Sequence, residues 1–158
     1  MKPKIWLNNL DGPVDDPAAS MLHDAASGFP ESVKSAIAAG VGSAGEIILC
    51  SSVAEASNHA IKGCALRTPE PGRILVSIGA PMAIRNSAKW LKQMGWEVAD
   101  LESGGDADII AVELVSHETG VIRDISTIRE QYPETILVVE ASAAVGRIPI
   151  SSDGIDAL

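Results

Sequence analysis

The sequence predicts an α/β fold in three layers, α/β/α, with a mostly parallel sheet between two layers of helices. Short apolar runs typical of strands alternate along the chain with Ala-rich or amphipathic runs typical of helices. Several strand runs, such as Ile136–Val139, are apolar throughout, which indicates strands buried on both faces. The 158 residues suffice for one domain with a hydrophobic core, and we expect an N-terminal arm over 1–16 and an α/β body over 17–158.

The expected elements follow one another without a linker or a repeat. Proline near the first turn and glycine after the last turn delimit helices, and turn residues delimit the apolar strand runs. An extended arm or first strand is expected over Lys4–Leu7. Further strands are expected over Glu46–Cys50, Arg73–Ile78, Trp96–Leu101, Asp108–Val112 and Thr135–Glu140, and helices over Pro17–Ala26, Pro30–Ala39, Val53–Leu66, Met82–Met94 and Asp124–Gln131.

Composition excludes several classes of function. The net charge is −9, which argues against nucleic acid and anionic membrane surfaces as partners, because both require a basic surface. No apolar run approaches the ~20 residues of a membrane span, and the N-terminus lacks the apolar core of a signal peptide, so we expect a cytoplasmic protein. The two cysteines, Cys50 and Cys64, lack the spacing of a zinc site, and we expect buried, reduced thiols and no metal.

Polar side chains follow several expected strands, at the edge where open α/β sheets bind ligands. Ser51 and Ser52 lie between a strand and a helix, where they either help to hold a phosphate or merely cap the helix, and the second reading is the commoner one. Glu140 ends its strand as a ligand contact or as the cap of the next turn. His117 is a base, a metal ligand or, more commonly, a polar loop residue.

Several separated segments, in the same order, resemble the cysteine desulfurases of the class V aminotransferase family. The resemblance covers nearly all 158 residues but only the front part of a full desulfurase, and it implies part of the large domain of pyridoxal phosphate (PLP)-dependent transferases. The matching segments are Trp6–Asp15, Glu55 and Asn58 with Ala60-Ile61-Lys62-Gly63, Trp90–Val98, Asp108–Ile125, and the last strand followed by Val145-Gly146-Arg147-Ile148-Pro149-Ile150.

The resemblance also implies where the family holds PLP, and the chain departs from the family at those positions. In the phosphate turn, Val53 enters and Ala54 lacks a hydroxyl. A ring-stacking His is replaced by Ala80, and an Asn is replaced by His117. We therefore expect a vestigial site and no bound cofactor. The vestigial contacts are Ser51, Ser52, Ala54, Ala80, His117, Glu140 in place of Asp, Ser142 in place of Thr, and Ala143 in place of Gln.

A PLP enzyme also needs a lysine for its Schiff base. In the family this lysine comes shortly after the segment that matches Ile150, and the persulfide cysteine and the substrate-binding arginine come later still. No lysine of this chain follows a late strand, so we expect no catalytic residue in the chain itself. The lysines are Lys2, Lys4, Lys34, Lys62, Lys89 and Lys92.

The leading hypothesis is therefore a desulfurase-like pseudoenzyme or partial domain with a binding or scaffold role in sulfur or iron–sulfur metabolism. It would form a homo- or hetero-oligomer, with a full-length desulfurase or a sulfur-acceptor protein as the partner. One alternative is half of a split, active PLP-dependent desulfurase or aminotransferase whose lysine comes from another chain. Another is a small-molecule binding module that uses Glu140 and His117 without PLP.

Overall fold

The structure is a computed structural model that describes residues 4–7, 31–42 and 45–158. The expected helix Pro17–Ala26, most of the N-terminal arm and most of the motif Trp6–Asp15 lie outside the described residues. The elements are β1 (Lys4–Leu7), α2 (Glu31–Gly40), β2 (Glu46–Leu49), α3 (Val53–Ala65), β3 (Arg73–Val76), α4 (Met82–Gln93), β4 (Glu97–Asp100), the 3₁₀ turn η1 (Leu101–Ser103), β5 (Ile109–Glu113), α5 (Ile125–Gln131) and β6 (Ile136–Glu140).

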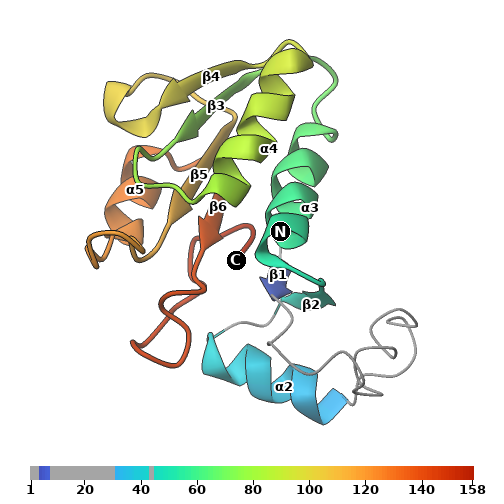
Figure 1. The fold of residues 1–158 in the computed structure, drawn as a ribbon, viewed down its shortest axis with the longest axis vertical. Helices are drawn as coiled ribbons and strands as arrows, with labels where there is room; N and C mark the ends of the chain where they lie inside the picture. Colours follow the sequence, from blue (N-terminus) through green and yellow to red (C-terminus); the bar gives the residue numbers. More distant parts are fainter. Residues whose placement is uncertain (1–3, 8–30, 43–44) are drawn as a thin grey trace.

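The central sheet has four strands in the order β4-β3-β5-β6. All of its pairings are parallel, and the register of β5 and β6 places Glu113 beside Glu140 at their carboxyl ends. Strands β1 and β2 form a separate parallel pair, and α3 contacts both β1 and β6 (Figure 1). Ala157 forms a further parallel bridge to Val138 in β6. The parallel sheet expected from the continuous apolar strands is confirmed.

Helices and the C-terminal segment cover the two faces of this sheet. Alternate residues of a strand face opposite sides, so in β5 Ile109 and Ala111 pack in one hydrophobic cluster with α3 and α4. Ile110 and Val112 pack on the other face with Ile128 of α5 and with apolar residues of the C-terminal segment, Ala141, Ala144, Ile155 and Leu158. Figure 1 shows α3 and α4 together on one side of the sheet and α5 apart from them. The three-layer α/β/α arrangement is therefore confirmed.

The boundaries of the elements follow local hydrogen bonding. Ser52 caps α3 by accepting a hydrogen bond from the Glu55 amide (3.1 Å), and Asp124 caps α5. The strand expected over Trp96–Leu101 is too long at both ends. The Trp96 amide donates to the Leu91 carbonyl at the end of α4 (3.1 Å), and Leu101 begins η1, so neither residue is available to the sheet ladder.

Arg129 in α5 fixes the C-terminal segment against the sheet. Its Nε donates to the Gly154 carbonyl (2.7 Å), and its Nη1 donates to the carbonyls of Tyr132, Pro133 and Thr135. Its Nη2 pairs with Asp156 Oδ2 (2.7 Å), which also accepts from the Leu137 amide in β6. One guanidinium thereby connects α5, β6 and the chain after β6, because arginine presents several donors in a rigid plane.

Replacing this arginine is expected to destabilise the whole fold. Arg129→Ala removes charge-assisted hydrogen bonds from a side chain that is only 21% exposed, so urea unfolding should show a loss of about 2 kcal/mol. The matched control is Arg147→Ala, because the guanidinium of Arg147 donates one hydrogen bond to the nearby Ala143 carbonyl and is exposed. That variant should stay within about 0.5 kcal/mol of the parent. Equal losses in the two variants would contradict the role of Arg129 in joining α5, β6 and the C-terminal segment.

Candidate functional site

Two glutamates mark the carboxyl edge of the sheet. Glu113 and Glu140 are the last residues of β5 and β6 and are register partners. Each lies two residues after a side chain in the α3/α4 cluster, Ala111 or Val138, so both carboxylates lie on that face of the sheet. The buried fraction of the two side chains differs little, but their partners differ.

Glu140 is surrounded by residues of its own turn and of the β5–α5 loop. Its Oε1 accepts a hydrogen bond from the Ser142 amide (2.7 Å), so Glu140 caps the turn after β6, one of the two roles expected for it. Its Oε2 lies 3.7 Å from His117 Nε2 and is buried without a hydrogen bond. The Glu140 side chain is 9% exposed, whereas the His117 side chain is 53% exposed. His117 thus covers the carboxylate from the solvent side.

The same cluster contains a Ser, a His and an acid, but it is not a hydrolase triad. Ser142 Oγ lies 3.3 Å from His117 Nε2, the same ring nitrogen that faces Glu140. In a nucleophilic triad the acid binds one ring nitrogen and the hydroxyl binds the other, which allows the imidazole to remove the hydroxyl proton. Ser142 therefore lacks the arrangement that would activate it.

The other predicted contacts begin at α3. Ser51 donates from both its amide (2.6 Å) and its hydroxyl (2.7 Å) to Glu55 Oε2, and Ser52 caps the helix. The hydrogen bonds from the Ser51 hydroxyl and amide lower the pKa of Glu55. The helix-cap role expected for this turn is confirmed. Within the described residues, no hydrogen bond or ion pair joins Ser51 or Ser52 to the cluster of His117 and Glu140.

The three predicted alanines bring no polar side chain to the site. Ala54 is exposed, and its carbonyl accepts from the Asn58 side chain (2.7 Å). Ala80 is 4% exposed and lies in the α3/α4 cluster, and its carbonyl accepts from Arg85 Nε (2.7 Å). Ala143 is half-buried. The methyl group of Ala80 is thus a core contact and does not face an open crevice.

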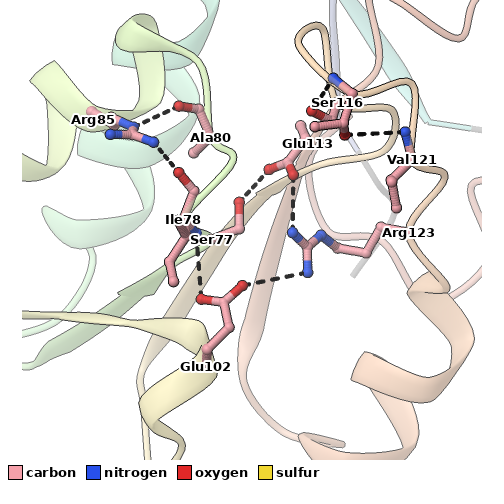
Figure 2. Close-up of polar contacts among 10 residues, drawn as sticks. Ser77, Ile78, Ala80, Arg85, Glu102, Glu113, Ser116, Val121 and Arg123 are labelled. Carbon is pink, nitrogen blue, oxygen red and sulfur yellow. Dashed lines mark hydrogen bonds and ion pairs between the residues drawn. The ribbon is translucent and has the colours of Figure 1, made fainter.

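The sequence analysis missed a charged network beside these residues, shown in Figure 2. Glu113, 3% exposed, accepts from Ser77 Oγ and from Arg123 Nη2 (2.9 Å), and Arg123 Nη1 lies 3.8 Å from Glu102 Oε1. Burial alone would raise the pKa of Glu113, but the hydrogen bonds from Ser77 and Arg123 outweigh it, so the pKa is lowered. An acid at the end of an apolar strand run drew attention to Glu140, and the same signal is present at Glu113.

Cys50 is a buried thiol at the end of β2. It is 4% exposed, and its Sγ lies 4.0 Å from His59 Nδ1. Burial raises the pKa of Cys50 to about 11, and the nearby negative charge of Glu55 adds to the effect. The expected burial is confirmed for Cys50, whereas Cys64 is only half-buried. A thiol with so high a pKa is a poor nucleophile, because the thiolate is the reactive form.

In residues 4–7, 31–42 and 45–158, no group of three or more His, Cys, Asp or Glu side chains is arranged to hold a metal ion. Over the same ranges, no helix combines the length and the apolar character that crossing a bilayer requires.

Known proteins with similar sequences show the family of this chain. No protein-family model matches the chain. Cysteine desulfurase IscS 1 of Archaeoglobus fulgidus is 31% identical over 133 residues, which cover 73% of this chain and 35% of that protein. Cysteine desulfurase IscS of Pectobacterium carotovorum is 33% identical over 123 residues, covering 66% of this chain and 30% of the relative. The chain is a cysteine desulfurase homologue. It spans about a third of the length of these curated relatives.

Solved structures of other proteins share the fold of this chain. The crystal structure of DndA from Streptomyces lividans superposes with a TM-score of 0.60 at 21% identity, covering 89% of this chain and 51% of that one. A NifS-like protein gives a TM-score of 0.61 at 17% identity, covering 96% of this chain and 52% of that one. The resemblance inferred from the separated motifs is confirmed at the level of the family and of the fold.

The low reactivity of Cys50 is directly testable. In a Cys64→Ser variant Cys50 is the single remaining thiol, and at about pH 8 roughly one Cys50 in a thousand is ionised. Dithiobis(nitrobenzoate) should therefore label the native variant very slowly and label the guanidinium-unfolded variant at the rate of a free thiol. The reciprocal variant, Cys50→Ser, reports Cys64 alone. Fast labelling of native Cys50 would contradict the buried, protonated thiol.

Glu113 should contribute to stability in a pH-dependent manner. Because its pKa is lower in the folded state, its contribution is present above the unfolded value of about 4.3 and is lost as the pH falls through the folded pKa. At neutral pH, Glu113→Gln should lower the free energy of unfolding by about 1–3 kcal/mol, and the difference from the parent should shrink on acidification below that window.

The matched control for this prediction is Glu97→Gln. Glu97 also pairs with an arginine, Arg73, but its side chain is 66% exposed. Exposed pairs contribute little, so the control should change the free energy of unfolding by less than about 1 kcal/mol. Urea titrations from about pH 3 to pH 7 measure both variants. A Glu113→Gln effect that is independent of pH would contradict the lowered pKa.

Proposed function

We propose that this desulfurase homologue is a non-catalytic binding or scaffold protein of sulfur or iron–sulfur metabolism. Its homology to cysteine desulfurases supports the link to sulfur metabolism at a coarse level. The observation that carries the non-catalytic assignment is the state of Glu140. Its carboxylate caps a turn through one oxygen and is covered by His117 at the other, so the chain's own residues close the acid that the resemblance assigns to the cofactor ring.

The ring end of the implied cofactor fits these residues poorly. When PLP is bound to an enzyme it supplies an electron sink, and a carboxylate partner holds its ring nitrogen protonated. Here a ring would have to displace His117 from Glu140 and would meet no aromatic side chain at Ala80, which is buried in the core. A shift of about an ångström in such a carboxylate is enough to disturb a preorganised site.

The phosphate end fits poorly as well. Both donors of Ser51 are occupied by the carboxylate of Glu55, and Ala54 supplies no hydroxyl. A phosphate at the start of α3 would retain the backbone amides of the first turn but would have to compete with a negatively charged side chain. We therefore derive no chemical step through PLP in this chain.

The lysines of the two large helices support the same conclusion. Lys62 lies in the last turn of α3, where its Nζ is 4.5 Å from the centre of the Trp90 ring. Lys89 and Lys92 lie in the second half of α4. Helices α3 and α4 follow the carboxyl ends of β2 and β3, so the residues in their later turns lie in the parts of the helices that lead away from that edge (Figure 1).

A partner surface is available on the loops of the carboxyl edge. The apolar side chains of Ile78 in the β3–α4 connection and of Met82 at the start of α4 are 58% and 66% exposed, and those of Val121 and Ile122 in the β5–α5 loop are 64% and 59% exposed. Exposed large apolar side chains near one site favour a protein contact. We propose a full-length desulfurase or a sulfur-acceptor protein as the partner in a homo- or hetero-oligomer.

A second candidate is a small-molecule binding module without PLP. It is favoured by Glu140 Oε2, a buried acceptor with no hydrogen bond, because a ligand donor would satisfy it once His117 moves aside. The split-enzyme alternative requires instead that a partner chain supply the Schiff-base lysine. Ligand titrations of the purified chain separate these three functions.

The experiment is a titration of the purified chain with PLP, alone and with a full-length desulfurase of the same organism. We expect the parent chain and Glu140→Ala to give the same result: neither the aldimine absorbance nor the yield of borohydride-trapped adduct should depend on Glu140. This control is needed because free aldehyde also labels surface lysines, and such labelling persists in Glu140→Ala. A Glu140-dependent adduct would overturn the non-catalytic assignment. Calorimetric binding of a phosphate ester that Glu140→Ala abolishes would favour the binding module.

A further inference from the structure

Arg123 is held by two carboxylates from different elements. Its Nη2 donates to Glu113 Oε1 at 2.9 Å, and its Nη1 lies 3.8 Å from Glu102 Oε1 in η1. Glu113 is buried, and a buried carboxylate is tolerated only when it is paired and hydrogen-bonded. The Arg123 guanidinium therefore supplies the charged partner that the buried Glu113 carboxylate requires.

The same network reaches the β3–α4 connection. Ser77 Oγ donates to Glu113, and the Ile78 amide donates to Glu102 Oε2 at 3.3 Å. Figure 2 shows Arg123 between the two glutamates, with Ser77 and Ile78 on the opposite side of them. The planar guanidinium contacts both carboxylates at once, an arrangement that a lysine ammonium does not reproduce.

Arg123 is also the last residue of a hairpin, residues 114–123, in the β5–α5 loop. Its amide donates to the Leu114 carbonyl (2.9 Å), and the Ser116 amide donates to the Val121 carbonyl (2.9 Å). The Leu114 amide donates to the Glu140 carbonyl (2.7 Å), which ties the base of the hairpin to β6. The base of the hairpin is thus joined to β5 by the chain and to β6 by a hydrogen bond, whereas residues 117–122 at the tip are exposed.

His117 lies at this exposed tip and faces Glu140. With few buried contacts of its own, the tip depends on the base for its orientation. Glu113 and Glu140 are register partners, so an arginine anchored on Glu113 holds the hairpin beside the neighbouring carboxylate. At the tip of this anchored hairpin, His117 Nε2 lies 3.7 Å from Glu140 Oε2.

We propose that Arg123 is the positioning residue of the Glu140 site: by pairing with Glu113 and Glu102 it holds the 114–123 hairpin so that His117 covers Glu140. This inference rests on the proposed closure of Glu140 by the chain's own residues. It adds a specific cause for that closure, and it assigns Arg123 and Glu113 a role that does not involve contact with any ligand.

The test measures whether His117 still senses Glu140. In the full-length chain, Glu140→Gln should move the NMR resonances of the His117 ring, because it removes a charge close to Nε2. In an Arg123→Gln background this Glu140-dependent shift should be lost almost completely. In an Arg123→Lys background it should be only partly retained, since the ammonium cannot bridge both carboxylates.

The matched control is Arg73→Gln. The Arg73 side chain is 25% exposed, as is that of Arg123, and it also bonds to loop carbonyls and a glutamate, but at the amino end of β3. Arg123→Gln leaves Glu113 unpaired and could fail to fold for that reason. In that case the double variant Glu113→Gln/Arg123→Gln, which removes both charges, is used in place of Arg123→Gln. The Glu140-dependent shift should persist in Arg73→Gln and disappear in the double variant.

Two results would overturn the proposal. One is a Glu140-dependent shift of the His117 ring that is unchanged by loss of Arg123. The other is an equal loss in Arg73→Gln, which would mean that general destabilisation moves the hairpin. Neither readout involves PLP or a partner protein. Failure of the positioning role is therefore distinguishable from failure of the proposed function, which the Glu140-dependent PLP adduct reports.

Discussion

A parallel sheet covered on both faces leaves room for polar side chains only where its strands end. In β5 and β6 every residue before the terminal glutamate packs against one helical layer or the other. Charge can therefore enter this fold at Glu113 and Glu140, and the chain must supply each carboxylate with partners there. The carboxyl edge is the place where the stability of the sheet and the chemistry of the site depend on the same side chains.

The two glutamates meet this requirement in different ways. Glu113 receives an arginine and a hydroxyl, a well-satisfied pair in which hydrogen bonding outweighs the cost of burial. Glu140 receives one backbone amide and a histidine at 3.7 Å, which leaves one oxygen buried without a hydrogen bond. The first arrangement is suited to holding structure. The second retains an acceptor that a ligand or a rearranged loop can still use.

The fold of this desulfurase homologue and the chemistry proposed for its site depend on different residues. The segment Trp90–Val98, which resembles the family's pattern, spans the end of α4 and the start of β4, and its Leu91 and Trp96 are buried in the α3/α4 cluster. At Ala54, Ala80 and Ala143, positions that the resemblance assigns to cofactor contacts, this chain offers neither a side-chain donor nor a stacking face. Packing constrains residues across the whole sheet, whereas cofactor contacts constrain a few loop positions, so the second set can change while the fold persists.

Much of the fold could be predicted from local patterns in the amino-acid sequence. The continuous apolar runs predicted the parallel strands, and the Ser51-Ser52 turn predicted the cap of α3, because periodicity and capping depend on residues close in sequence. The predicted start of β4 was one residue too early because the Trp96 amide donates its hydrogen bond to the Leu91 carbonyl near the end of α4. For the site, sequence alone identified Glu140 and His117 as candidates but not as partners.

The sequence by itself determined which residues have the chemistry to matter: acids at the ends of apolar strands, a histidine in the following loop, and alanines where the family has polar groups. Only the tertiary structure decided that Arg123 pairs with Glu113 and Glu102, that His117 lies against Glu140, and that Ala80 is a core contact. The physical reason is that strand register and the attachment of the 114–123 hairpin to β6 bring these groups together, and both depend on contacts between segments distant in sequence.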